Sequence, residues 1–150
     1  MSTTPEENKR IVRRIREEVE QQGNLDAIDE IFAEDVVTHT PVGEFRGPDA
    51  IREMYESDSE AFADSTETIH SVVAEGDTVA MRLTESGTHN GPFMGIEPTG
   101  RPFEIETMSF FRLEDGRIAE WWVQPDMLGF VQQLGVTPDD LRAAVPASDD

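Results

Sequence analysis

The chain has 150 residues, the length of one compact domain with its own core. It has no cysteine, which excludes disulfides, thiol catalysis and cysteine-bound metal. No apolar run reaches the length of about 18 residues that a transmembrane helix needs. The first residues, MSTTPEENKR, lack the basic-then-apolar pattern of a signal peptide, so we expect a cytoplasmic protein.

Acidic residues dominate the charge: 32 Asp and Glu face 12 Lys and Arg, which gives a formal net charge of −20. The acid is spread over the whole chain rather than gathered in a tail. This pattern is typical of proteins from halophiles, because molar salt shortens the Debye length to about 3 Å and screens the repulsion. We therefore expect a halophilic source. No basic stripe is present to neutralise phosphates, so we expect no nucleic-acid partner.

The first half of the chain has helical periodicity. Residues 5–21 predict an amphipathic helix, which ends at Gly23, and Asn24 is expected to cap a second short helix. The segment DVVTHTP (35–41) predicts a short strand, and residues 47–64 predict a third helix.

The second half changes to a period of two. Residues 66–88 predict two strands joined near 75–77, and residues 102–125 predict a second hairpin that turns at Asp115 and Gly116. The segment DMLGFVQQLG (126–135) predicts a helix. Another is expected at 137–145, with Thr137 as its cap and Pro138 in its first turn.

Helices followed by a long antiparallel sheet indicate an α+β fold. We expect one domain over residues 1–145 and a frayed acidic tail over 146–150. A strongly curved sheet with the helices on its concave side would form a cone around a deep apolar pocket.

Several segments carry a family resemblance when taken together. They are VVTHTP followed by GPDAIREM, then GTHNGPFMGIEPTGR, FRLEDGRIAEWW, and Asp126 followed by LGFVQQLG. Their order and spacing over residues 8–136 resemble the SnoaL-like polyketide cyclase (ester cyclase) family of the nuclear transport factor 2-like superfamily. The resemblance implies the cone fold and a cofactor-independent enzyme that closes a polyketide ring by intramolecular aldol condensation. It also implies a homo-oligomer, a dimer or higher.

The resemblance places the family's acid/base aspartate at Asp126, and its histidines at His39 and His89. A carboxylate among apolar residues has raised basicity, so one such group can remove a proton and later return it. The alternative is that Asp126 only caps the helix that follows it. His39 would bind the substrate carbonyl or orient the acid/base, or it is an ordinary core residue. The direction of His89 depends on whether a bulge shifts its strand.

Six side chains are expected to bind substrate in the pocket: His89, Trp122, Phe93, Met108, Tyr55 and Arg82. Arg82 alternates with apolar residues along its strand, so it either binds a substrate oxygen or pairs across strands with a glutamate. The three histidines, among them His70, have no short ligand spacing, and we expect no metal site. No cofactor-binding motif is present in the sequence.

The loop over residues 91–102 is long, stiff and apolar for a plain connection. Either Phe93, Met94 and Ile96 form a lid over the pocket, or they pack on a second subunit. The leading functional hypothesis is acid/base cyclisation or a related isomerisation of a small apolar carbonyl compound. The alternatives are a non-catalytic module that binds a small molecule, and an epoxide hydrolase-like enzyme on the same cone.

Overall fold

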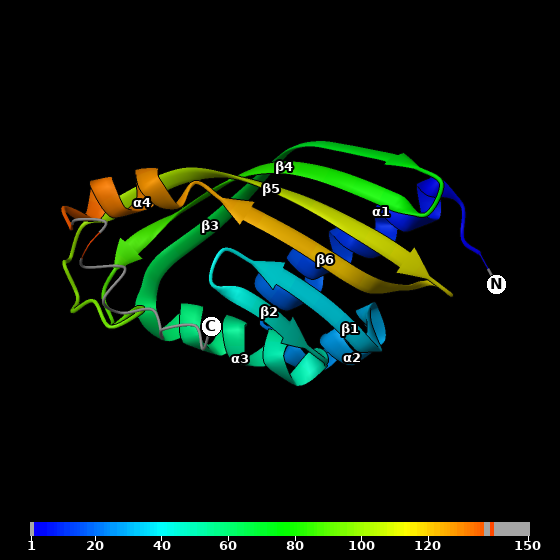
Figure 1. Cartoon of the computed structure of the whole chain (residues 1–150), viewed down its shortest axis with the longest axis horizontal. Helices are drawn as coiled ribbons and strands as arrows, with labels where there is room; N and C mark the ends of the chain where they lie inside the picture. The colour runs from blue at the N-terminus through cyan, green and yellow to red at the C-terminus, as the bar shows by residue number, and fades with distance from the viewer. Residues whose placement is uncertain (1, 137–138, 140–150) are drawn as a thin grey trace.

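The computed structural model of the chain describes residues 2–136 and 139. A six-stranded sheet with the order β2-β1-β6-β5-β4-β3 curves over the helices, with α1 and α3 under its concave face (Figure 1). This is the predicted α+β cone.

The first predicted helix is confirmed and has two parts. Helix α1 (Pro5–Arg14) begins with Thr4, whose side chain accepts a hydrogen bond from the backbone N–H of Glu7 at 3.1 Å. It continues without a break into the π-helix η1 (Ile15–Glu20). Because a π-turn is wider than an α-turn, it changes which face each following residue presents, and such segments are frequent at functional sites.

The next segment differs from the prediction in four respects. The short helices η2 (Leu25–Ala27) and α2 (Ile28–Ile31) are present, but the side chain of Asn24 makes no capping hydrogen bond. Strand β1 (Phe32–Thr40) is longer than predicted, and it forms a hairpin with an unpredicted strand, β2 (Gly43–Arg46). Strand β1 also pairs in parallel with β6, so the sheet is mixed rather than wholly antiparallel.

Helix α3 (Pro48–Ala61) leads directly into β3 (Phe62–Glu75), and β4 (Thr78–His89) returns beside it. Strands β5 (Pro102–Glu114) and β6 (Arg117–Pro125) form the second predicted hairpin. Its turn residues Asp115 and Gly116 have φ of 52° and 80°, the conformation of a type I′ turn.

Helix α4 (Met127–Leu134) follows β6 and ends at Gly135, which takes the left-handed conformation. The predicted helix at 137–145 and the tail at 146–150 lie outside the described residues, except for Asp139. No helix among the described residues is long and apolar enough to cross a membrane.

The core lies between the concave face of the sheet and the helices. Inward positions alternate along each strand, and in β5 every second residue from Phe103 to Leu113 is buried. The buried apolar residues of η1, α2 and α3 pack against this face. Strand alternation therefore fixes which side chains face the interior and which face outward.

Candidate functional site

A large cavity lies between the concave face of the sheet and the helices, with a volume of about 1220 Å³. Pockets for small molecules span about 300–1,000 Å³, so there is room for a multi-ring ligand. Much of the wall is apolar, including Val19, Leu83, Ile105, Phe111, Trp121 and Val123. The predicted apolar pocket is confirmed.

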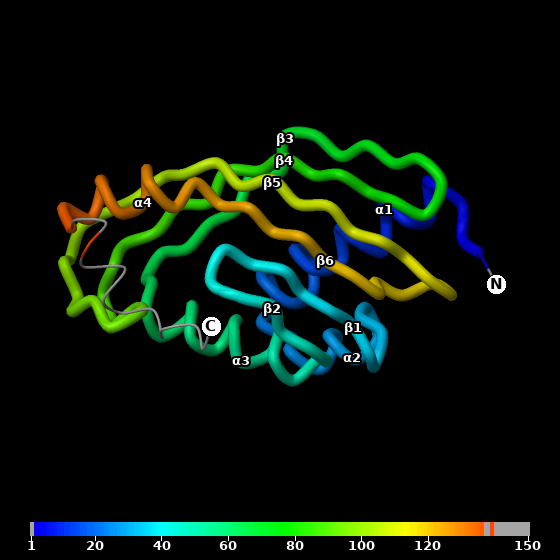
Figure 2. The backbone as a smooth tube through the Cα atoms, viewed as in Figure 1, coloured from blue at the N-terminus to red at the C-terminus, as the bar shows by residue number. Residues whose placement is uncertain are grey.

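Four phenylalanine rings form one end of the cavity wall. Phe62, Phe93, Phe103 and Phe130 contact each other with centroids 4.9–5.8 Å apart, mostly edge to face. They come from β3, the loop between β4 and β5, strand β5 and helix α4, and Figure 2 shows that this loop and α4 lie at the same end of the sheet. Edge-to-face contact lets these rings pack closely against one another at this end of the cavity.

A hydrogen-bonded group of carboxyl and hydroxyl side chains also faces the cavity. The hydroxyl of Tyr55 donates to Oε1 of Glu20 at 3.2 Å, and the hydroxyl of Thr107 donates to Oε2 of Glu85 at 3.0 Å. Glu67 connects the two, because its carboxyl hydrogen-bonds to both Glu20 and Glu85. Two adjacent carboxyl groups can hydrogen-bond only if one holds a proton. We call Tyr55, Glu20, Glu67, Glu85 and Thr107 the carboxyl network.

Burial keeps these acids protonated near neutral pH. Burial, followed by a hydrogen bond to Glu20, raises the pKa of Glu67 to about 9. Burial, followed by the charge of Glu67, raises the pKa of Glu85 to about 8. Burial, followed by the charge of Glu85, raises the pKa of nearby Asp58 to about 7. Asp58 lines the cavity and is exposed.

The fold explains why these acids meet. Glu67 and Glu85 are directly opposite partners on β3 and β4, and two like charges in such positions repel each other. Glu20 is the last residue of the π-helix η1, and Tyr55 comes from α3. Sequence reasoning missed the network because the chain has so many acids. A signal was present: Glu85 shares the strand face of Val79, Met81 and Leu83, which are all buried.

Tyr55 and Phe93 line the cavity, as the sequence predicted. Burial, followed by the charge of Glu20, raises the pKa of Tyr55 well above its usual value, so the phenol stays a hydrogen-bond donor. Phe93 stands on the loop between β4 and β5 together with Met94, which also reaches the cavity. Phe93 and Met94 are placed as the lid hypothesis predicts, whereas Ile96, the third residue of the predicted lid, is buried and does not line the cavity.

Asp126 is the N-cap of α4. Its Oδ1 accepts a hydrogen bond from the backbone N–H of Gly129 at 2.9 Å, and the residue is exposed. Its neighbours Pro125 and Met127 line the cavity, so Asp126 lies beside the cavity wall. The capping role is present in the structure, and the predicted acid/base role remains a prediction.

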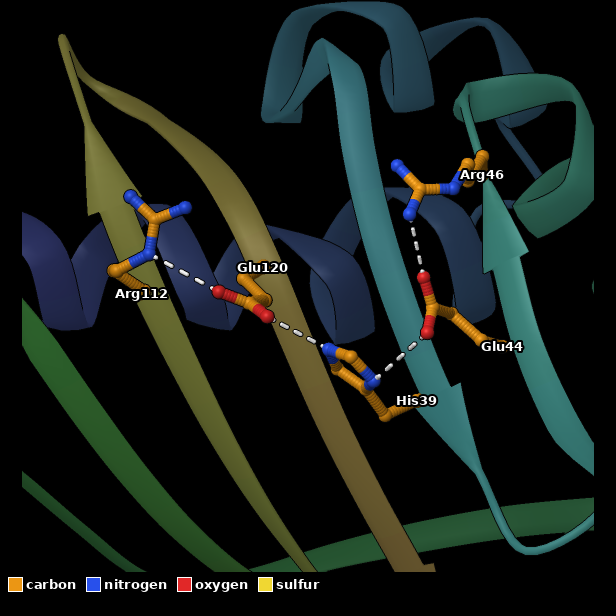
Figure 3. Close-up of polar contacts among 5 residues, drawn as sticks. All are labelled: His39, Glu44, Arg46, Arg112 and Glu120. Carbon is orange, nitrogen blue, oxygen red and sulfur yellow. Dashed lines mark hydrogen bonds and ion pairs between the residues drawn. The ribbon is translucent and has the colours of Figure 1, made fainter.

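His39 lies on the outer face of the sheet, away from the cavity. Its ring stacks on Trp122 with centroids 5.3 Å apart, and its Nε2 lies 2.7 Å from Oε2 of Glu120. Figure 3 shows the continuous row of charged groups that runs from Arg112 through Glu120 and His39 to Glu44 and Arg46. The inward residues of β1 are Val36 and Thr38 instead. The structure therefore does not bring His39 and Asp126 together around a substrate.

Four more predicted substrate contacts lie outside the cavity. Trp122, Met108 and Arg82 point outward, and Arg82 pairs with Glu106 at 3.1 Å, as the cross-strand alternative predicted. His89 is 0% exposed and does not line the cavity. Strand alternation explains the outward three, since each follows or precedes a cavity residue by one position. Among residues 2–136 and 139, no cluster of three or more histidine or acidic side chains is arranged to hold a metal ion.

Comparison with known proteins matches residues 10–134 to the family model of SnoaL-like polyketide cyclases. The chain belongs to this family. It is 33% identical over 112 residues to aklanonic acid methyl ester cyclase DauD of Streptomyces sp. (strain C5), covering 72% of this chain and 68% of DauD. It is 30% identical over 122 residues to nogalonic acid methyl ester cyclase of Streptomyces nogalater, covering 79% and 91% of the two chains.

A solved structure supports the same family assignment. The chain resembles the crystal structure of IdmH, a candidate polyketide cyclase from Streptomyces antibioticus, with a TM-score of 0.75 and 33% identity. The match covers 86% of this chain and 99% of IdmH. The SnoaL-like cyclase fold thus supplies the cavity, and this chain's own residues supply the carboxyl network within it.

Proposed function

We propose that this SnoaL-like cyclase enolises a small apolar carbonyl compound and closes a ring by intramolecular aldol condensation. One observation carries the proposal: Glu67, Glu85 and Asp58 face a large, mainly apolar cavity, where burial raises the pKa of their carboxyl groups. The names of the relatives, cyclases of aklanonic and nogalonic acid methyl esters, support ring closure as the reaction type.

The chemistry needs one base and one acid. The base takes a proton from a carbon between two carbonyl groups, and the enolate carbon then bonds to a second carbonyl carbon. The resulting alkoxide takes a proton from the acid, so the reaction is a net isomerisation that needs no co-reactant. A base works best when its pKa lies near the working pH, and an acid when it remains protonated there.

We assign the acid to Glu85 and the base to Asp58. Both line the cavity, with a pKa of about 8 for Glu85 and about 7 for Asp58. Thr107 orients the Glu85 carboxyl, and Glu67 can return a proton to it through their hydrogen bond. Asp126, nominated by the family resemblance, is the competing base. The apolar wall and the four phenylalanine rings would hold a flat substrate by contact rather than by charge.

Deuterium exchange tests the proposal without knowledge of the product. The protein is incubated in D2O and molar KCl with a panel of β-keto esters, and loss of the acidic C–H signal is followed by NMR. We expect exchange well above background, lowered at least about tenfold in Asp58→Asn, as removal of a general base does. Glu106→Gln is the matched control, because Glu106 stands on the outer face and should not affect exchange.

The variants also separate the alternatives. Loss of exchange in Asp126→Asn with full exchange in Asp58→Asn would move the base to Asp126. Background exchange in the wild type for every ester, together with a tightly bound co-purified ligand, would contradict catalysis and favour the binding module.

We propose further that the chain forms a homodimer through the outer face of its sheet. Exposed apolar side chains lie side by side there, since Phe110 pairs with both Ala80 and Trp122, and Val73 pairs with Ala80. Phe110 is 53% exposed, Val73 59% and the adjoining Met108 54%.

The charge of the outer face also fits a dimer. Its arginines, Arg82 and Arg112, are paired with glutamates on the same face, which limits repulsion between two acidic copies. Light scattering after gel filtration should show a dimer for the wild type and a monomer for Phe110→Glu. Leu128→Glu, at an exposed site on α4, is the control. A monomeric wild type would contradict the dimer.

A further inference from the structure

His89 is a buried histidine whose ring takes no part in the cavity wall. It is the last residue of β4, is 0% exposed, and stands where the loop of residues 90–100 leaves the sheet. We call residues 90–100 the cavity loop, because its residues Phe93 and Met94 line the cavity.

The ring of His89 accepts hydrogen bonds from the far end of this loop. The backbone N–H of Thr99 donates to Nδ1 of His89 at 3.2 Å, and the Thr99 hydroxyl lies 3.1 Å from the same nitrogen. The Thr99 hydroxyl oxygen already accepts from the backbone N–H of Arg101, so its proton is free for Nδ1. Nδ1 therefore carries no proton, and the ring is neutral with its proton on Nε2.

The rest of the cavity loop is anchored by backbone contacts that do not titrate. The backbone N–H groups of Asn90 and Gly91 both donate to the carbonyl oxygen of Ala61 at 2.9 Å. Phe93 and Ile96 exchange backbone hydrogen bonds at 3.1 and 2.9 Å, forming a small hairpin at the tip. The return end of the loop is held by the ring bonds of His89 and by two backbone bonds, from Gly100 N–H to the His89 carbonyl oxygen at 2.8 Å and from His89 N–H to the Arg101 carbonyl oxygen at 3.0 Å. Among the described contacts of the cavity loop, the hydrogen bonds to Nδ1 of His89 are the ones that protonation of a side chain would change.

We propose that His89 is a positioning residue: its neutral ring holds the cavity loop closed over the substrate cavity, and protonation of the ring releases the loop. A proton on Nδ1 would face the backbone N–H of Thr99, so that hydrogen bond would be lost, and the Thr99 hydroxyl would have to turn from donor to acceptor. Among the described residues the charged ring would then be buried without a carboxylate partner, which is costly.

Among the residues that the structure describes, no nearby charge compensates for this proton. The charged side chains on the elements packed around His89 are Glu60 of α3, Asp64 of β3, Glu104 of β5, and Glu97 and Arg101 of the loop segment. All five are exposed, and none has a described bond to the ring. Burial accordingly lowers the pKa of His89, and a weaker effect of the Gly91 backbone raises it.

The sign of the pH effect follows from this lowered pKa. In the open loop the ring is solvated and takes a proton near its ordinary pKa of about 6.5. In the closed state the ring takes a proton only at a lower pH. Between the pKa of the closed state and that of the open state, the open state therefore binds more protons. Closure therefore weakens as the pH falls below about 6.5. The consequence for turnover rests on the proposed function, whereas the loop movement does not.

His89→Asn is the decisive variant, because the Asn side-chain oxygen can accept from Thr99 in place of Nδ1 but cannot be protonated. Amide hydrogen exchange of the cavity loop, corrected for the intrinsic effect of pH, is measured from pH 7.5 to 5. We expect opening in the wild type to increase at least about tenfold over this range. The His89→Asn loop should stay closed throughout, and His89→Ala should be open throughout. His70→Asn, at an exposed histidine of β3, should behave as the wild type.

Protection that is independent of pH in the wild type, or an equal acid-induced opening in His89→Asn, would overturn the proposal. If His89→Asn does not fold, an NMR titration of the wild-type ring decides instead: a His89 pKa at or above 6.5 would overturn it. Loop opening with no deuterium exchange of any β-keto ester would contradict the proposed function and leave the role of His89 intact.

Discussion

Glu67 and Glu85 face each other across β3 and β4 and share a hydrogen bond inside the cavity. A sheet normally avoids such a pair, because two carboxylates directly opposite repel each other. Here protonation removes the repulsion. Because a raised pH favours the loss of that proton, the free energy of unfolding falls as the pH rises. The pair therefore links the proposed catalysis to the stability of the fold.

Glu67→Gln should stabilise the protein at alkaline pH. The pKa of Glu67 is raised to about 9, whereas in the unfolded chain it returns to about 4.3. The unfolded state thus binds fewer protons between these values, and stability falls as the pH rises through this window. Glutamine keeps a donor and never ionises. We expect a gain of about 1–3 kcal/mol at pH 8 and little change at pH 4.5, measured by urea unfolding.

The exposed Glu106→Gln variant serves as the comparison, since its contribution should not follow this pH window. Equal effects of Glu67→Gln at both pH values would show that the carboxyl does not hold a proton in the folded state.

Asp126 has a capping role that can be separated from any catalytic role. Its Oδ1 accepts from the N–H of Gly129, so Asp126→Ala should lower the free energy of unfolding by about 1 kcal/mol. Asp126→Asn keeps the acceptor and should cost little. Urea unfolding measures both. A stable Asp126→Asn protein that has lost deuterium exchange would establish the acid/base role that the family resemblance implies, against our assignment to Asp58.

Gly91 allows the cavity loop to pass close to helix α3. A Cβ at this position would lie 2.2 Å from the carbonyl oxygen of Glu60, far inside van der Waals contact. Gly91→Ala should therefore destabilise the protein by about 1–3 kcal/mol and increase amide exchange in the loop. Its exposed neighbour provides the control, because Asn90→Ala keeps the backbone bonds and should change stability by less than about 0.5 kcal/mol. A neutral Gly91→Ala would show that the loop does not pack as described.

Salt should stabilise the protein strongly. We propose that the net charge of −20 is an adaptation to molar salt, where repulsion between exposed acids is screened. The melting temperature should rise as KCl increases from about 0.1 to about 2 M. A variant with Glu17, Glu34 and Asp35 changed to amides should need less salt, since all three are exposed. A melting temperature that falls or stays constant with KCl would contradict the adaptation.

The sequence predicted the elements well where local chemistry decides them. The turn at Asp115 and Gly116 and the start of α3 at Pro48 carry their own conformational preferences. The sequence did not predict the strands and pairings that depend on tertiary contacts. The parallel pairing of β1 with β6 depends on residues about 80 positions apart, and Gly43–Arg46 is too short and exposed to show a period.

The site was predicted less well, for the same reason. Period two shows which residues of a strand share a face but not which face is inside. By strand alternation His39 shares a face with Val37 and Pro41, yet this face of β1 turns outward to Trp122. Glu85 lies on an otherwise apolar strand face, and only the pairing with Glu67 gives that position chemical meaning.

The central claim is that the cavity holds carboxyl groups protonated near neutral pH. A 13C NMR titration of the glutamate and aspartate carboxyl carbons tests it directly, with Glu67→Gln and Glu85→Gln to assign the signals. We predict two glutamate carboxyls that titrate above pH 7, with the loss of either glutamate shifting the other. Glutamate carboxyls that all titrate below about pH 5, near their ordinary values, would contradict the account.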